Sequence, residues 1–577
     1  MVEVPTDVLT GALTWLAPAL LPLVAALLLL SPLQRMRPLL PLAALPALVL
    51  ALFAPPGAVD LPWLFRGARF GLDDTSRIFL LFTAALWLAG GLHAAGYFHD
   101  DPRRRAFWLF WLAAMAGNFG LVLALDAASF YVFFALMSFA SYGLVVHTRT
   151  PEALQAGRVY LALVVVGELA LFAAIALAWQ AAGSLRLDAI GAALAGSPQR
   201  DAVTALTLLG FGIKVGALPL HVWLPLAHPV APTPASAVLS GAMIKAGLLG
   251  WLRLLPLGTV AAPAWGEVLI ALGLTAAFAA ALVGATQRQA KAALAYSSIS
   301  QMGFVTVAVG IALAVPAAAP AAIAAATLYA FHHAFAKAAL FLGVSLAGAA
   351  TPRSRALWML GVALPALALA GAPLTSGYAA KAALKAALPA DFVGLTAALT
   401  LAAAGTTLVM LRVVWLLRQD AKGGAHAAHA PNGAMWSGWG LLVLLSLLGW
   451  PAVGRIADLG PTTADAWFGA TWPLLLGAAL AALAAAWRRR AAGGREFTVP
   501  PGDLLVPLLA LARGRPTPAP AAETHAHAGH GPETGVQAVV PSWPALGRAE
   551  AALSAQGGLA LAAIAAALAV LLIALVG

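Results

Sequence analysis

The chain has 577 residues, of which 62% are hydrophobic and only 10% are charged, and its formal net charge is +11. Water-soluble domains carry about 25% charged residues, so this composition excludes a soluble protein and indicates an integral membrane protein. The chain contains no cysteine, which excludes disulfides, thiolate metal sites and iron–sulfur clusters ligated by it. No glycine-rich phosphate loop follows a strand-like segment. We therefore expect no cofactor, no metal and no catalytic redox centre in this chain.

Long apolar runs dominate the sequence and predict its fold class. A helix needs roughly 20 apolar residues to span a bilayer, and about sixteen such segments are present. They begin near residues 8, 36, 74, 106, 128, 157, 202, 233, 265, 292, 319, 357, 391, 437, 468 and 556. The runs are continuous rather than alternating, which excludes a membrane β-barrel. We predict an all-α fold, a polytopic membrane helical bundle.

The excess of positive charge predicts topology rather than binding to nucleic acid. With sixteen helices, all the basic clusters fall in loops on one side of the membrane, and Arg66, Arg69 and Arg200 are the exceptions. The clusters are Arg35/Arg37, Arg103/Arg104/Arg105, Arg149/Arg158, Arg288/Lys291, Arg353/Arg355, Arg418/Lys422 and Arg488/Arg489/Arg490/Arg495. The positive-inside rule then makes the basic side cytoplasmic and both termini periplasmic, in a bacterial inner membrane. The acidic N-terminus predicts no cleavable signal peptide.

The segments divide the chain into one large body and a different C-terminal region. Residues 1–490 are predicted to form a continuous helical bundle with short loops. Residues 491–555 are rich in Gly, Pro and His and are predicted to be a cytoplasmic connector. A last transmembrane helix is predicted at 556–577.

Two of the apolar segments carry glycines and prolines that predict interrupted helices. Paired interruptions of this kind are typical of ion sites in transporters, because they expose backbone polar groups to a cavity. The two sets are Gly212, Gly216 and Pro219 around Lys214, and Gly371, Pro373 and Gly377 just before Lys381.

Five charged residues lie within apolar segments, namely Glu168, Lys214, Lys245, Lys337 and Lys381. A lysine at the centre of a spanning helix costs roughly 2.5–3.5 kcal/mol on insertion scales. A row of lysines and histidines with one acid can pass protons, because the proton affinity of each buried group responds to its neighbours. We therefore interpret these residues as a proton pathway.

A histidine pair adds to this row. His333 is four residues from Lys337, so the two share a helix face. His332, His221, His228 and Ser300 are further candidates for the pathway. Each residue also has a structural interpretation. Glu168 could form an interhelical salt bridge, and the imidazoles and hydroxyl could make ordinary interhelical contacts. Lys337 lies closer to a helix end than the other lysines, which favours a structural role for it.

Four long motifs carry a resemblance to a known family. They are GFGIKVGALPLHVWLPLAHPVAPTPASAVLSGAMIKAG at 210–247, KAALAYSSISQMGF at 291–304, LYAFHHAFAKAALFLG at 328–343 and GAPLTSGYAAK at 371–381. With these motifs the chain resembles the antiporter-like proton-translocating subunits of respiratory complex I (the L, M and N type). It is also similar to subunits of Mrp cation/proton antiporters and of energy-converting hydrogenases such as the hydrogenase-4 B component.

The resemblance implies two inverted five-helix repeats, at 105–256 and 264–420, each with one broken helix. Transmembrane helices at 1–100 and 437–490 would flank them. It also implies roles along a polar axis. Lys214 matches the central lysine of the first broken helix and Lys245 the bridging lysine. His333 and Lys337 match a histidine–lysine pair on the family's eleventh transmembrane helix, and Lys381 matches the terminal lysine of the second broken helix.

The chain departs from the family pattern at three acidic positions. Ala135, Leu226 and Gln289 stand where the family usually carries a carboxylate. Glu168, on the next helix, is our candidate replacement for the missing acid at Ala135.

These observations predict a proton-conducting membrane subunit of a complex I-like or hydrogenase-like assembly. Its proton movement would be coupled to quinone-linked electron transfer in partner subunits. The expected partners are other membrane subunits, soluble redox subunits and the lipid bilayer. One alternative is a subunit of a monovalent cation/proton antiporter. Another is a conduit or scaffold of an ion or inorganic-carbon uptake module. The missing acids favour the two alternatives, whereas the retained lysines favour proton translocation.

Overall fold

The computed structural model describes residues 6–29, 32–65, 67–348, 351–423, 431–456, 464–490 and 498–504. The first α-helices are α1 (Thr6–Leu28), α2 (Leu45–Phe53), α3 (Asp74–Tyr97), α4 (Arg104–Leu123), α5 (Ala127–Val145), α6 (Pro151–Ala182), α7 (Leu187–Ala195), α8 (Arg200–Val215), α9 (Trp223–Val230), α10 (Thr233–Val238) and α11 (Ile244–Leu254). The remaining α-helices are α12 (Pro263–Thr286), α13 (Ala290–Ala314), α14 (Ala319–Val344), α15 (Pro352–Ala370), α16 (Ser376–Ala386), α17 (Val393–Gly423), α18 (Gly433–Ile456) and α19 (Ala464–Arg490).

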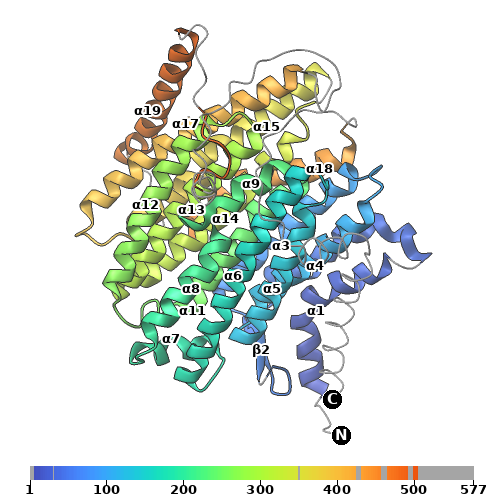
Figure 1. Cartoon of the computed structure of the whole chain (residues 1–577), viewed down its shortest axis with the longest axis vertical. Coiled ribbons are helices and arrows are strands. Elements are labelled where there is room, and N and C mark those ends of the chain that lie inside the picture. Colours follow the sequence, from blue (N-terminus) through green and yellow to red (C-terminus); the bar gives the residue numbers. More distant parts are fainter. Residues whose placement is uncertain are drawn as a thin grey trace, which may run out of the picture.

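The helices lie side by side in one bundle, with α3, α13 and α14 among those in its interior (Figure 1). Every predicted start from residue 8 to residue 468 lies within a helical element or two residues before one. Among the described residues, 11 helical segments are long and apolar enough to cross a membrane. The chain is therefore a multi-pass membrane protein. Most of the predicted connector at 491–555, and the helix predicted at 556–577, lie outside the described residues.

Small residues set the spacing of the best-packed helix pair, α12 and α13. A Cβ atom added to Gly303 would lie 2.5 Å from the carbonyl oxygen of Gly273, and one added to Gly266 would lie 2.5 Å from that of Gly310. Backbones that approach this closely gain van der Waals contact that larger side chains would prevent.

The all-α prediction was incomplete, because residues 57–72 form an antiparallel hairpin of β1 (Gly57–Leu61) and β2 (Ala68–Leu72) with Val59 opposite Phe70. The helix predicted near residue 36 also differs. Residues Pro32–Ala44 form a 3₁₀ helix (η1) before α2, and this helix contains Pro38 and Pro41. Proline cannot donate the backbone hydrogen bond of an α-helix, which accounts for the tighter local winding.

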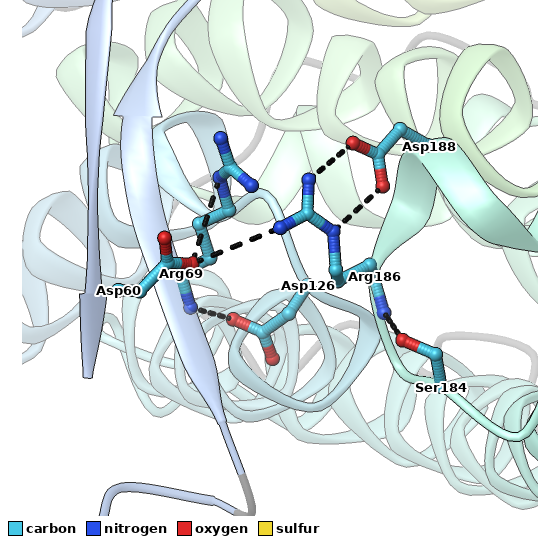
Figure 2. A network of polar contacts seen from close by, with 6 residues as sticks. All are labelled: Asp60, Arg69, Asp126, Ser184, Arg186 and Asp188. Carbon is cyan, nitrogen blue, oxygen red and sulfur yellow. Dashed lines mark hydrogen bonds and ion pairs between the residues drawn. The ribbon is translucent and has the colours of Figure 1, made fainter. Parts of the chain in front are cut away.

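A polar network fixes the hairpin to the ends of two helices (Figure 2). The buried Asp126 side chain accepts hydrogen bonds from the backbone N–H of Arg69, at 2.8 Å, and from that of Ser129, at 2.8 Å, and so caps the N-terminus of α5. Arg186, just before α7, pairs with Asp188 at 2.6 Å and with Asp60 of β1 at 3.9 Å.

Both predicted helix interruptions are present. α8 ends at Gly216, whose φ of +76° is left-handed, and the chain resumes helical structure at η2 (Leu220–Val222) and α9. α15 ends in the same way at Gly371, with φ +90°, and α16 begins at Ser376. A left-handed residue at this position is a common helix stop that only glycine adopts freely. The two breaks place Lys214 and Lys381 next to helix ends.

Candidate functional site

The first break holds a buried ammonium group on a tyrosine. Lys214 lies in the last turn of α8 and is 3% exposed. Its Nζ donates a hydrogen bond to Tyr160 Oη at 2.9 Å, and Tyr160 Oη donates to the carbonyl oxygen of Ser138 at 2.8 Å. The Tyr160 and Phe134 rings also lie 5.2 and 5.7 Å from Nζ, within range of cation–π attraction.

Glu168 supplies the negative charge of this cluster. It lies on α6 two turns beyond Tyr160, so the two side chains share a helix face. Glu168 is buried and interacts electrostatically with Lys214. One of its carboxylate oxygens has no hydrogen-bond partner among the described residues. The structure therefore places an acid near the first lysine, although Ala135 carries none.

The central cluster joins α11 to α14. Lys245 Nζ lies 2.5 Å from His333 Nδ1 and donates to the carbonyl oxygen of Ser240, also at 2.5 Å. Both side chains are fully buried. When Lys245 is an ammonium group, His333 Nδ1 must be unprotonated to accept its hydrogen bond. One proton is thus shared between a lysine and an imidazole.

Two serines connect this pair to Lys337. Ser240 Oγ and Ser298 Oγ are 2.8 Å apart, and Ser298 Oγ donates to the carbonyl oxygen of Leu294 at 3.0 Å. Lys337 Nζ donates to the same Leu294 oxygen at 2.8 Å. Ser240 belongs to η3, a π-helical turn at Leu239–Met243, and such turns frequently occur at functional sites.

The second break holds the last lysine and a histidine. Lys381 Nζ donates to the carbonyl oxygens of Leu369, at 3.0 Å, and Ala370, at 2.9 Å. These carbonyls end α15, where the helix dipole favours a cation. His332 Nδ1 lies 2.8 Å from Ser376 Oγ, at the start of α16. Histidine and lysine thus approach opposite sides of the same break.

A cavity of about 310 Å³ opens beside Lys381. It lies between the second break and α13, α17 and α19. The residues that line it include Phe304, Gly371, Tyr378, Lys385 and Thr400. The cavity is large enough for several water molecules. Lys381 is itself one of the lining residues, so water in this cavity would contact its side chain.

The three remaining pathway candidates are His228, Ser300 and His221, and their surroundings differ. His228 is fully buried, stacks on Phe341 with ring centroids 4.6 Å apart, and has no hydrogen-bond partner for either ring nitrogen among the described residues. Ser300 Oγ donates to the carbonyl oxygen of Ala277 at 2.8 Å, which is an interhelical contact between α13 and α12. His221 binds Asp503.

Sequence reasoning missed several members of these clusters. Tyr160 was overlooked, although its spacing of eight residues from Glu168 puts it on the same helix face. Ser240 carried no recognisable signal, because its role depends on the π-helical turn.

A further chain of hydrogen bonds runs from Tyr329 Oη to Gln301 Oε1 at 2.7 Å, and from Gln301 Nε2 to Thr406 Oγ1 at 3.0 Å. No group of three or more potential metal ligands occurs in the described part of the chain.

These features define a class of protein: a multi-pass membrane protein with two broken helices and a series of buried lysine and histidine clusters. Residues 124–404 match the family described as NADH:quinone oxidoreductase/Mrp antiporter, TM. Residues 124–404, close to half of the chain, belong to this family, as the sequence motifs predicted.

Two relatives and one solved structure are similar to this chain. The chain is 30% identical to hydrogenase-4 component B of Escherichia coli over 46% of its own length and 39% of that protein. It is 32% identical to a probable K(+)/H(+) antiporter subunit of Rhizobium meliloti over 54% of its own length and 32% of that protein. A chain of the Mrp complex from Dietzia sp. has the same fold, with a TM-score of 0.67, 24% identity, and coverage of 90% of this chain and 64% of that one. The aligned regions therefore span well under half of both relatives.

The Tyr160–Lys214 contact predicts a coupled effect on stability. In Tyr160→Phe, the Ser138 carbonyl and the Lys214 ammonium each lose a partner inside the bundle, which should cost about 1–3 kcal/mol. In a Lys214→Met background the same change leaves no buried charge without a partner, so we expect a smaller loss of stability. Thermal unfolding of the four proteins of this cycle in detergent measures both. Equal losses in the two backgrounds would show that the contact carries no energy.

Proposed function

We propose that this chain is a proton-conducting membrane subunit of a complex I-like or hydrogenase-like assembly. Protons would move along Glu168, Lys214, Lys245, His333, Lys337 and Lys381, driven by electron transfer in partner subunits. The buried contact between Lys245 and His333 is the observation that carries this proposal. A lysine with a purely structural role would need only hydrogen-bond acceptors such as carbonyl oxygens. Lys245 also contacts the imidazole of His333, which can itself bind a proton.

The chemistry of the clusters supports a stepwise mechanism. A proton on Lys245 can pass to His333 Nδ1 along their hydrogen bond, after which Lys245 is neutral. The neighbouring lysine at 337 repels a second positive charge, so the protonation of one group lowers the proton affinity of the next. Lys381, which lines the cavity, would exchange protons with water there. Glu168 would set the charge state of Lys214 and replace the acid absent at Ala135.

The finer architecture and orientation belong to the same proposal. The similar construction of the breaks at Gly216 and Gly371 supports two inverted repeats, at 105–256 and 264–420. The basic clusters support a cytoplasmic position for the start of α4, α6, α13 and α15 in a bacterial inner membrane, with periplasmic termini. The partners would be further membrane subunits, with redox subunits supplying the energy.

A second candidate role for this chain is in a monovalent cation/proton antiporter. Its similarity to the K(+)/H(+) antiporter protein of Rhizobium meliloti and to the fold of the Mrp complex chain favours this role. The same polar axis would then carry protons down their gradient, in exchange for a cation.

Replacement of Lys245 by Met should remove the central proton carrier. We expect proton movement in membrane vesicles containing the native assembly to fall by a factor of about 10² or more, the range of a lost proton-transfer group. A pH-sensitive dye in the vesicle lumen measures it. Arg355→Gln, which removes one exposed positive charge from α15, is the matched control and should transport normally. Normal transport by Lys245→Met would contradict the proposal.

Glu168 has a matched control on its own helix. Glu168→Gln should abolish coupled proton movement, because the amide cannot ionise and leaves Lys214 without a counter-charge. Glu152→Gln, at the exposed first turn of α6, should leave transport unchanged. The same vesicle assay applies to both variants. Unchanged transport in Glu168→Gln would exclude this residue as the replacement acid.

Purification of the native assembly separates the two candidate functions. We expect mass spectrometry of the complex, isolated in gentle detergent, to find iron–sulfur, flavin or quinone-site subunits with this chain. Small membrane subunits alone would instead support the antiporter, and one soluble partner alone would support an uptake module.

A further inference from the structure

A short segment from the C-terminal region lies over the first broken helix. Residues 498–504, drawn in red near α9 and α17 in Figure 1, follow α19 in the chain but contact the α12–α13 junction. Gln287 Nε2 donates to the carbonyl oxygen of Val499 at 2.9 Å, and the Val499 N–H donates to Thr286 Oγ1 at 3.3 Å. These two bonds anchor the segment at its start.

The segment then turns onto Leu226 of α9. Gly502 is buried, with a left-handed φ of +86°, and a Cβ atom placed on it would lie 3.1 Å from Leu226 Cδ2. Glycine suits this position because it accepts the backbone conformation and allows the close approach. The turn directs the next residue, Asp503, at the break between α8 and α9.

Asp503 meets a histidine at this point. Both of its carboxylate oxygens lie 3.2 Å from His221 Nε2. The His221 side chain is 2% exposed, whereas that of Asp503 is 17% exposed. The carboxylate thus lies between solvent and the buried imidazole.

The two ends of this pair face different surroundings. Burial opposes ionisation of Asp503, but its interactions with His221, together with further hydrogen bonds such as the one from the Leu504 N–H, outweigh it and hold the pKa of the carboxyl below its usual value. His221 Nδ1 is buried and has no hydrogen-bond partner among the described residues. An imidazole accepts a proton at one nitrogen and releases it from the other, so it can transfer protons between its two sides.

We propose that Asp503 is the entry residue of the polar route, exchanging protons with water and passing them to His221. This proposal rests on the proposed function. In the transfer, the proton leaves a carboxylic oxygen of Asp503 and binds Nε2 of His221, so the pair keeps its net charge. Where the family usually has a carboxylate on α9, this chain has Leu226, and the segment brings the carboxylate of Asp503 to that region from far along the chain.

The first test separates the proton from the shape of the side chain. Asp503→Asn keeps the size and a hydrogen bond to His221 but cannot carry a proton, and we expect transport in vesicles to fall at least about tenfold. Asp503→Glu should restore most of it. Asp188→Asn, a carboxylate whose side chain is 66% exposed near the hairpin, is the control and should be normal. Normal transport by Asp503→Asn would overturn the proposal.

The second test needs no transport. Because the chain has no cysteine, His221→Cys introduces the only thiol of this chain. We expect a hydrophilic maleimide to label it slowly in the detergent-purified assembly. Labelling should become at least about tenfold faster when Gly502→Val pushes the segment off Leu226. Equal rates would show that the segment does not cover His221, which would overturn the proposal.

The combined results distinguish this inference from the proposed function. If Lys245→Met stops transport and Asp503→Asn does not, only the entry role fails. If the native assembly moves no protons at all, the proposed function fails and the entry role fails with it.

Discussion

The cost of burying positive charge is the constraint on which this structure depends. An ammonium group inside an apolar bundle is tolerated only when oxygen atoms or aromatic faces replace the water that it loses. The chain meets this need in three ways: a tyrosine hydroxyl for Lys214, a π-turn carbonyl and an imidazole for Lys245, and the carbonyls that end α15 for Lys381. The second helix break is therefore part of the solvation of Lys381.

This solvation is local, and that has consequences for function. The hydrogen-bond partners of the lysines are a tyrosine hydroxyl, backbone carbonyls and one imidazole. The charge of each lysine therefore depends on a small number of neighbours. Glu168 acts on Lys214 in the first cluster. Among the described residues, no acid has a comparable effect on Lys245 or Lys337. A change of charge at one cluster is transmitted to the next through space, since repulsion between cations falls off slowly where water is excluded.

Hydropathy and motif spacing predicted much of the fold and several of the residues that the structure gathers into buried lysine and histidine clusters. Continuous apolar runs located the helices, and the glycines at 216 and 371 located the breaks, because both signals act over a few residues. The hairpin at 57–72 escaped, since its strands are short and its stability depends on contacts with Asp126 and Arg186 far along the chain. The buried lysines were evident because charge in an apolar run is rare. Their partners were less evident: Tyr160 resembles any aromatic core residue, and Asp503 lies in a region whose composition indicated only a connector.

The close contact of α12 and α13 limits how this protein can move. Gly266, Gly273, Gly303 and Gly310 bring the two backbones together so tightly that a single added carbon would collide with the opposite helix. Such a pair cannot slide by a helical turn without driving side chains into backbone, so the two helices move as one rigid unit. The proposed proton route borders this pair, because Lys337 binds the Leu294 carbonyl of α13. Along such a border, conduction would depend on rotation of side chains and exchange of water molecules. That mode would suit a particle as small as a proton, whereas a larger ion would need helices that can separate.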